Sequence, residues 1–351
     1  MKHTSYIGFI MLAGIAFIAG TSCSKDFSGE FTQYPNNPLN DTIWTANVKP
    51  TDAVNTIVTD LMPAFEKETL NLENTLSEIK VGGNDSFRIS FAKGIFTSLE
   101  NGVITPVKPE GTAEIQIFRI RRTGDLIKCM RSTQSSNVLA ETVGGFFIKV
   151  IKDGKELSIA DRGASYQLKW IETGVSNPKK DMRRFYAKES SPAPDYNVTD
   201  VNFEWKPDTD ITEIDIEQGN SGLYPYSYYK TNLSSLRWVS LQRNLVVSPN
   251  SKIRLTTYFP PNFTNKNTAV FACYKNQKTM VRLNFDYASR SFNTDLLPPG
   301  AEIKIISISK IGSNYYLSEK AVSNLTTAFC INKLEPEKIS LAKLQAYLDE
   351  Q

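Results

Sequence analysis

The sequence predicts a mainly β protein with two β-sandwich domains, a short helix before them and a second helix at the C-terminus. Short runs in which apolar and polar residues alternate with a period of two are the first observation, because half-buried strands have this pattern. Turn-forming residues between many of these runs are the second. The third is a Ser- and Pro-containing break at residues 188–194, which is typical of a linker between domains.

The N-terminal segment has the three parts of an export signal. Lys2 supplies a positive charge, residues 7–19 are apolar, and small and polar residues precede Cys23. The apolar stretch is shorter than the ~20 residues of a transmembrane helix, so we expect cleavage. Residues 20–23 (GTSC) resemble a lipobox, although a lipobox usually carries Leu where Gly20 stands. We therefore expect residues 1–22 to be a lipoprotein signal peptide; the alternative is a plain secreted protein.

Lipid on Cys23 would attach the mature chain to a membrane, because each buried CH₂ group contributes ~0.8 kcal/mol. The residue after Cys23 is Ser24 rather than the Asp associated with inner-membrane retention. Lys25 and Asp26 partly resemble the surface-export signal of Bacteroidota-type lipoproteins. We expect an outer-membrane, outward-facing protein, with a periplasmic orientation left open.

Residues 23–48 are polar and rich in Asn, Pro, Ser and Gly, which predicts a flexible stalk. Within it, residues 41–43 (DTI) resemble the Asp-Thr-aliphatic signal that Bacteroidota exporters glycosylate. Thr42 is therefore a candidate for O-glycosylation.

A short amphipathic helix is expected next, because apolar residues recur at i, i+3, i+4 and i+7. These residues are Val54, Ile57, Val58 and Leu61. Thr51 is the expected N-cap and Pro63 the expected end of the helix.

Strands are expected from there onward. The runs lie at residues 88–91, 113–120, 145–151, 166–170, 253–257, 269–274, 280–285 and 303–308. Turn signals lie at residues 101–102, 153–154, 260–262 and 298–300. We expect one domain over residues 49–190 and a second over 195–351, which closes with a helix behind Ser340. The apolar face of that helix is formed by Leu341, Leu344 and Leu348.

Several turn and core segments resemble a ZU5-like β-sandwich, a module that recurs in Bacteroidota surface lipoproteins. The segments are residues 91–96, 111–115, 144–149, 153–157, 166, 236–239, 267–271 and 299–300. The resemblance covers roughly residues 85–320 and implies a fold rather than a chemistry. Better-studied ZU5 and related domains are protein-docking modules, and some cleave themselves at a site that requires histidine.

Charge and histidine content narrow the function. The one histidine, His3, lies in the signal, so the mature chain would have none. This excludes Ser-His-Asp and Cys-His nucleophile systems, and most zinc and copper sites. Loss of Lys2 reduces the formal charge from +3 to +2, which gives no electrostatic basis for binding nucleic acid or acidic substrates. We expect no cofactor and no metal.

Three cysteines remain besides the one expected to carry lipid: Cys129, Cys273 and Cys330. Cys273 and Cys330 could pair in an oxidising compartment, and buried free thiols are the alternative.

Aromatic residues crowd one short stretch, and such residues stack on sugar rings or anchor protein interfaces. The candidate ligand contacts are Tyr224, Tyr226, Tyr228 and Trp238. In a β-rich fold the same residues often fill a core, so both interpretations remain.

An acidic cluster comprises Asp208, Asp210, Glu213, Asp215 and Glu217. The calcium-loop pattern requires Gly where Glu213 stands, so a charged edge strand that deters sheet-to-sheet pairing explains the cluster better. Ser340 and Lys343 have the spacing of a Ser-x-x-Lys nucleophile, but the partner motifs are missing, and Ser340 is expected to cap a helix.

These observations favour a non-enzymatic surface lipoprotein with a binding or assembly role, whose partner is an unknown surface protein or glycan. The alternative is a carbohydrate-binding accessory lipoprotein of a nutrient-uptake system. A histidine-free hydrolase is a third class, because paired carboxylates can hydrolyse glycosides.

Overall fold

The expectation of a mainly β protein is confirmed. The computed structural model describes residues 41–81, 87–135, 138–160, 164–173, 177–187, 203–209, 214–221, 224–245, 252–323, 325 and 329–351. Residues 41–351 form one compact unit. Cys23 and the linker predicted at residues 188–194 lie outside the described residues.

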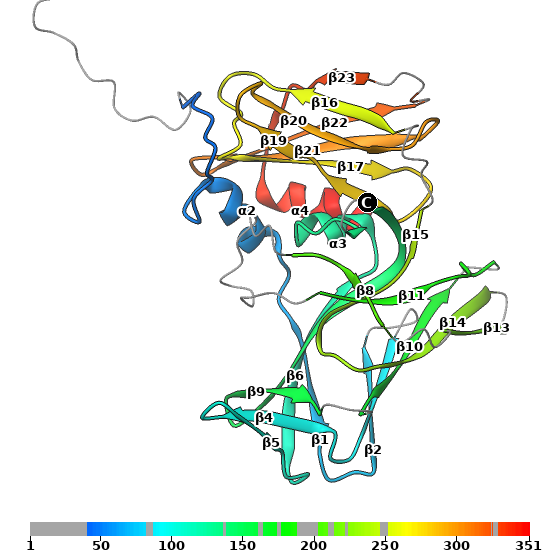
Figure 1. The fold of residues 1–351 in the computed structure, drawn as a ribbon. Coiled ribbons are helices and arrows are strands. Elements are labelled where there is room, and N and C mark those ends of the chain that lie inside the picture. Colours follow the sequence, from blue (N-terminus) through cyan, green and yellow to red (C-terminus); the bar gives the residue numbers. More distant parts are fainter. Residues whose placement is uncertain are drawn as a thin grey trace, which may run out of the picture. The chain divides into compact units, whose positions relative to one another are not determined.

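Strand β8 (Val138–Lys152) is the spine of a ten-stranded sheet, the β8 sheet (Figure 1). One edge of β8 pairs with β6, and the other edge pairs with β15 and, nearer the end of β8, with β9; all these pairings are antiparallel. The other members of this sheet are β1 (Glu66–Asn71), β4 (Phe96–Glu100), β5 (Val103–Pro106), β6 (Thr112–Ile120), β7 (Gln134–Ser135), β9 (Lys155–Ile159), β11 (Arg183–Ala187), β12 (Lys206–Pro207) and β15 (Arg237–Asn244).

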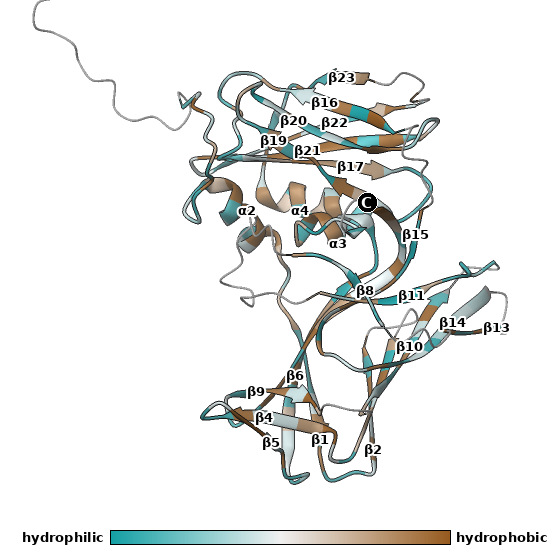
Figure 2. Cartoon of the chain, in the orientation of Figure 1, coloured by the Kyte–Doolittle hydropathy of each residue, from teal (hydrophilic) through white to brown (hydrophobic). Residues whose placement is uncertain are grey.

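A five-stranded sheet, the β10 sheet, packs one face against the β8 sheet. In order across the sheet, its strands are β13 (Asp215–Ser221), β14 (Tyr224–Leu233), β10 (Tyr166–Thr173), β3 (Phe87–Ala92) and β2 (Leu76–Val81). The shared core contains Ile89 and Leu168 from the β10 sheet and Phe146 and Ile148 from β8, all fully buried. Figure 2 shows the alternation of hydrophobic and hydrophilic residues along such strands.

Two further sheets share a second core. The β16 sheet comprises β19 (Asn284–Asp286), β20 (Ser291–Leu297), β16 (Ile253–Tyr258) and β23 (Phe329–Lys333). The β17 sheet comprises β18 (Met280–Arg282), β17 (Thr268–Tyr274), β21 (Ile303–Ile311), β22 (Asn314–Val322) and β24 (Glu337–Ile339). Leu255, Val270 and Ile305 pack in the core between them, so both sheet pairs are consistent with β-sandwich packing.

The strand predicted at residues 280–285 is two strands. β18 pairs with β17, whereas β19 pairs with β20 of the other sheet. Leu283 lies at the crossing, where its amide donates to the Val270 carbonyl at 2.9 Å. The sequence showed one apolar run because both short strands contribute to the same core.

Three helices, α2 (Ala53–Leu61), α3 (Thr123–Lys128) and α4 (Leu341–Glu350), lie beside the β17 sheet in the described part of the chain (Figure 1). The apolar residues predicted for α2 are all buried, and they pack with Phe271 and Ile306. The N-cap is Asp52 rather than the predicted Thr51, because Asp52 is the last residue with extended backbone. The helix ends before Pro63, as expected.

Helix α4 confirms the predicted closing helix. Ser340 is its N-cap and accepts a hydrogen bond from the Lys343 amide at 3.3 Å. Leu344 and Leu348 are fully buried, and α4 packs on α3. Ser340 therefore stabilises a helix end, and the Ser-x-x-Lys spacing reflects capping.

The end of the predicted stalk is packed against the protein. The Trp44 ring lies 5.2 Å from the Phe292 ring, and Asn265 exchanges hydrogen bonds with the Thr45 backbone. Val48 packs beside the α2 core. The stalk prediction was therefore wrong for residues 41–48, because one Trp in a polar segment provides enough apolar surface for docking.

Sheet pairing crosses the linker predicted at residues 188–194. β10 pairs with β14, and β15 pairs with both β8 and β11. All strands of the β16 and β17 sheets begin after Leu245. The division between the sheet pairs therefore falls between β15 and β16.

Lys278, in the turn between β17 and β18, connects the two sheet pairs. Its ammonium donates to the Val143 carbonyl at 2.7 Å and to Glu172 Oε1 at 2.9 Å. Its own carbonyl accepts from the Thr142 amide at 3.0 Å. Glu141 nearby is buried and pairs with Arg243 at 2.6 Å.

Candidate functional site

Two of the predicted aromatic contacts lie on the solvent face of the β10 sheet. Tyr226 and Tyr228 alternate on β14 with Ser227 and Tyr229, which are both fully buried. The Tyr226 and Tyr228 ring centroids are 4.7 Å apart with an interplanar angle of 61°. The Tyr224 side chain lies outside the described residues, although its backbone belongs to β14. This pair offers ring surface to a ligand.

Trp238 does not belong to this surface, and its prediction as a ligand contact was wrong. Its side chain is 1% exposed and packs in a core with Phe147, Phe203 and Trp205. The Arg131 guanidinium lies within 6.0 Å of its ring. Trp238 therefore has the core role that was the alternative interpretation.

Four cations stand opposite one another on neighbouring strands of the β10 sheet and form the cation row. Lys230 of β14 is opposite Lys169 of β10, which is opposite Arg88 of β3, which is opposite Lys80 of β2. Asp215 of β13 is opposite Lys230 and ends the row. Each directly opposed pair of like charges destabilises a sheet by about 0.2–1 kcal/mol. The row therefore lowers stability unless an anion compensates it.

A shallow hollow of about 200 Å³ lies along the cation row. Its lining residues are Glu78, Arg88, Ser90, Gln167, Lys169 and Lys230. Arg88 contacts Glu78 at 3.4 Å, while the Lys169 ammonium lies 3.7 Å from the Tyr228 ring centroid. Neither Lys169 nor Lys230 forms an ion pair with a described residue. Three cations and one anion therefore line the hollow, so its charge is positive.

Tyr226, beside the row, has a raised pKa and remains protonated at neutral pH. A hydrogen bond with Tyr228 is the main cause that raises the pKa of Tyr226. Lys169 acts in the opposite direction but is a smaller influence. Gly219 of β13 is opposite Tyr226, and a Cβ there would lie 2.3 Å from the Tyr226 hydroxyl oxygen. Glycine therefore leaves room for the Tyr226 ring over β13.

The acidic residues divide between two structural roles. Asp208 pairs with the buried Arg184 at 3.0 Å. Asp215 and Glu217 are exposed on β13, an edge strand of the β10 sheet, as expected for a charged edge. Asp210 and Glu213 lie outside the described residues. In the described ranges, no three His, Cys, Asp or Glu side chains are grouped as metal ligands.

A larger hollow of about 480 Å³ is lined mainly by α2, β1, β6, α3 and α4. Its charges compensate one another: Arg119 contacts Glu66 at 2.6 Å, and Lys128 contacts Asp349 at 2.5 Å. Asp125 accepts hydrogen bonds from backbone amides at the start of α3. This hollow is thus charge-balanced, in contrast to the cation row.

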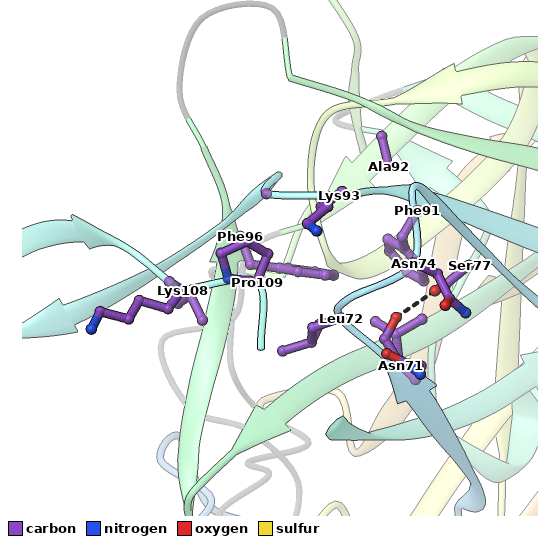
Figure 3. A pocket seen from close by; sticks show the side chains of 13 residues that line it. Asn71, Leu72, Asn74, Ser77, Phe91, Ala92, Lys93, Phe96, Lys108 and Pro109 are labelled. Atoms are coloured by element: carbon purple, nitrogen blue, oxygen red, sulfur yellow. Dashed lines mark hydrogen bonds between the residues drawn. The ribbon is translucent and has the colours of Figure 1, made fainter. Parts of the chain in front are cut away.

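A third pocket, shown in Figure 3, has a volume of only about 10 Å³. Leu72, Phe91 and Phe96 line it, and the Ser77 hydroxyl donates to the Asn71 carbonyl at its side. This volume is about that of one water molecule, which is too small for an organic ligand.

The three cysteines in the described part of the chain form no disulfide with one another. Cys129 and Cys273 are buried, and Cys330 on β23 is half-buried. Burial raises the pKa of Cys129 and of Cys273 to about 12. The pairing of Cys273 with Cys330 is thus not formed in this structure. Thr42 is exposed, and its modification stays a prediction.

Sequence reasoning missed the cation row because its members are far apart in the chain. Each is one polar residue in an alternating strand, and only the strand register aligns them. The alternation does assign each to a solvent face, which was the available signal.

None of the helices in the described part of the chain is long and apolar enough to span a membrane. Neither a scan against protein-family models nor a search of curated proteins finds a match for this chain.

Proposed function

We propose that this chain is an outer-membrane-anchored surface lipoprotein with a non-enzymatic binding role, held by lipid on Cys23. Its two sheet pairs would be ZU5-like and Ig-like sandwich modules. The sequence pattern at residues 20–23 supports the anchor. The half-buried Tyr226–Tyr228 pair, on the solvent face of β14 beside a positively charged hollow, supports binding, and it is the observation that carries the proposal.

The same pair favours carbohydrate over protein as the ligand. Tyrosine faces stack on sugar rings, and polar side chains around them can hydrogen-bond to hydroxyl groups. Ser90 and Gln167 provide such groups in the hollow. A protein interface normally has an apolar centre, which the lining of this hollow lacks. We therefore propose glycan binding, as in an accessory lipoprotein of a nutrient-uptake system.

A glycan array with the purified mature protein in detergent tests this function. The Tyr226→Ala/Tyr228→Ala double variant should bind about tenfold more weakly, since 1.4 kcal/mol corresponds to a factor of ten. Tyr287→Ala is the matched control, because Tyr287 is exposed in the turn between β19 and β20. Absence of binding to every glycan, or equal binding by both variants, would overturn the proposal.

The anchor has a separate test. Cys23→Ala should abolish fatty-acid labelling and release the chain from membranes. An unlabelled wild-type protein that still begins with Met1 would contradict the assignment.

A further inference from the structure

We propose that the ligand of the β10 sheet is an acidic polysaccharide that carries one carboxylate on each sugar and lies along the cation row. This inference rests on the binding function proposed above and names the class of substrate.

Charge complementarity is the first argument. Lys230, Lys169, Arg88 and Lys80 are consecutive across four strands, without an acidic residue between them. Adjacent strands are about 4.8 Å apart, so the row repeats a positive charge at about that interval over about 14 Å. A sugar ring in a linear chain is of similar length, which lets successive carboxylates face successive cations.

Unsatisfied groups at the row are the second argument. Arg88 Nε is buried and has no hydrogen-bond partner among the described residues. Lys169 and Lys230 have no carboxylate partner there. A carboxylate in the hollow would pair with the Lys169 and Lys230 ammonium groups and would offset the repulsion between the opposed cations.

The rows on either side of the cations are the third argument. On one side Tyr228 stands opposite Ile171, with Tyr226 beyond it. On the other side Gln167 stands opposite both Ser90 and Asn232. A bound polysaccharide would thus stack one sugar ring on the tyrosines and pair its carboxylates with the cation row. Its hydroxyl groups would form hydrogen bonds with the Gln167 and Asn232 amides. Asp215 and Glu217 on β13 repel an anion, which places the chain across β14, β10, β3 and β2.

Binding of polygalacturonate to the full mature protein tests this assignment. Each lost ion pair at a solvent-accessible site should weaken binding about two- to fivefold, so Lys169→Gln/Lys230→Gln should bind about tenfold more weakly than the wild type. Its affinity should also depend less on salt between 50 and 300 mM NaCl than that of the wild type. Fully methyl-esterified polygalacturonate, which is uncharged, should bind at least tenfold more weakly than the acid.

Lys320→Gln/Lys338→Gln is the matched control, because it removes the same charge from exposed positions on β22 and β24. It should bind polygalacturonate as the wild type does. Thermal unfolding of both double variants should show that each is folded.

The outcomes separate the two proposals. If no glycan binds, the binding function itself fails. If the ester and the acid bind equally and Lys169→Gln/Lys230→Gln is unaffected, glycan binding stands and the acidic assignment fails. Tighter binding of heparin would replace carboxylate by sulfate. Equal binding of polyglutamate or single-stranded DNA would show attraction to any polyanion and would overturn the assignment to a polysaccharide.

Discussion

Gly124 is the position at which the structure predicts the clearest effect of adding one carbon atom. It lies on α3 where α4 crosses, and a Cβ at this residue would lie 1.7 Å from the Leu348 carbonyl oxygen and 2.7 Å from its carbonyl carbon. Both are backbone atoms, so no side chain can rotate away. Ordinary contact begins at 3.4 Å, so α3 and α4 must move apart by more than 1 Å in Gly124→Ala.

The magnitude follows from what this separation disrupts. Overpacking a core costs typically 1–3 kcal/mol, and loosening the fully buried Leu344 and Leu348 adds part of the 2–5 kcal/mol that each would lose on truncation to Ala. Alanine regains up to about 1 kcal/mol through its higher helix propensity. We expect Gly124→Ala to lower the free energy of unfolding by about 2–4 kcal/mol.

Urea unfolding followed by tryptophan fluorescence measures this change, because Trp205 and Trp238 lie in the same core. Thr123→Ala, on the neighbouring residue of α3, is the control and should change stability by less than about 0.5 kcal/mol. A Gly124→Ala variant as stable as the wild type would refute the close crossing of α3 and α4.

Three further predictions concern buried charge and thiols. Asp208→Asn should lower stability by about 3 kcal/mol, because it leaves the Arg184 guanidinium buried without its carboxylate; a loss below 1 kcal/mol in urea unfolding would contradict this. Burial raises the pKa of Cys129 and Cys273 from 9.0 to about 12. The part of the folding stability that depends on the protonated thiols is therefore fully present below pH 9 and is lost as the pH rises toward 12. Between pH 8 and 9.5 each thiol should account for a loss of about 0.8 kcal/mol, measured by urea unfolding, whereas a flat profile would argue against burial. Cys330 is half-buried, so a membrane-impermeant maleimide should label it on intact cells of the native host if the protein faces outward. The Cys330→Ser variant should give no label. Labelling that occurs only after lysis would place the protein inside the envelope.

The strands could be predicted from the sequence where one face of the strand is buried and the other is exposed to solvent. β3 shows this alternation, with Phe87, Ile89 and Phe91 buried and the residues between them more exposed. β15 does not, because residues 238–242 are all buried and both faces of the strand are covered. Because β15 shows no alternation, nothing in the local sequence distinguishes the buried Trp238 from an exposed aromatic residue. The expectation of a ligand contact at Trp238 was wrong for this reason.

The tyrosines of β14 also show that the sequence does not reveal which aromatic residues are buried. β14 carries Tyr226 and Tyr228 on its solvent face and Tyr229 on its buried face, so aromatic content does not reveal which face is the core. The cation row required the register of four strands, which depends on hydrogen bonds between segments far apart in the chain. The sequence therefore indicated one strand of the candidate site, β14, whereas the cation row followed only from the pairing of four strands.

The contacts of Lys278 determine whether the two sheet pairs can be expressed as separate fragments. A fragment that ends after Leu245 would leave the Val143 carbonyl and Glu172 without the ammonium that both contact. It would also uncover Leu139, which packs with residues of β16 and β17. Neither sheet pair is complete without the other at this boundary, so separately expressed halves should be insoluble. Crystallisation and ligand screening should therefore use a chain that retains both sheet pairs.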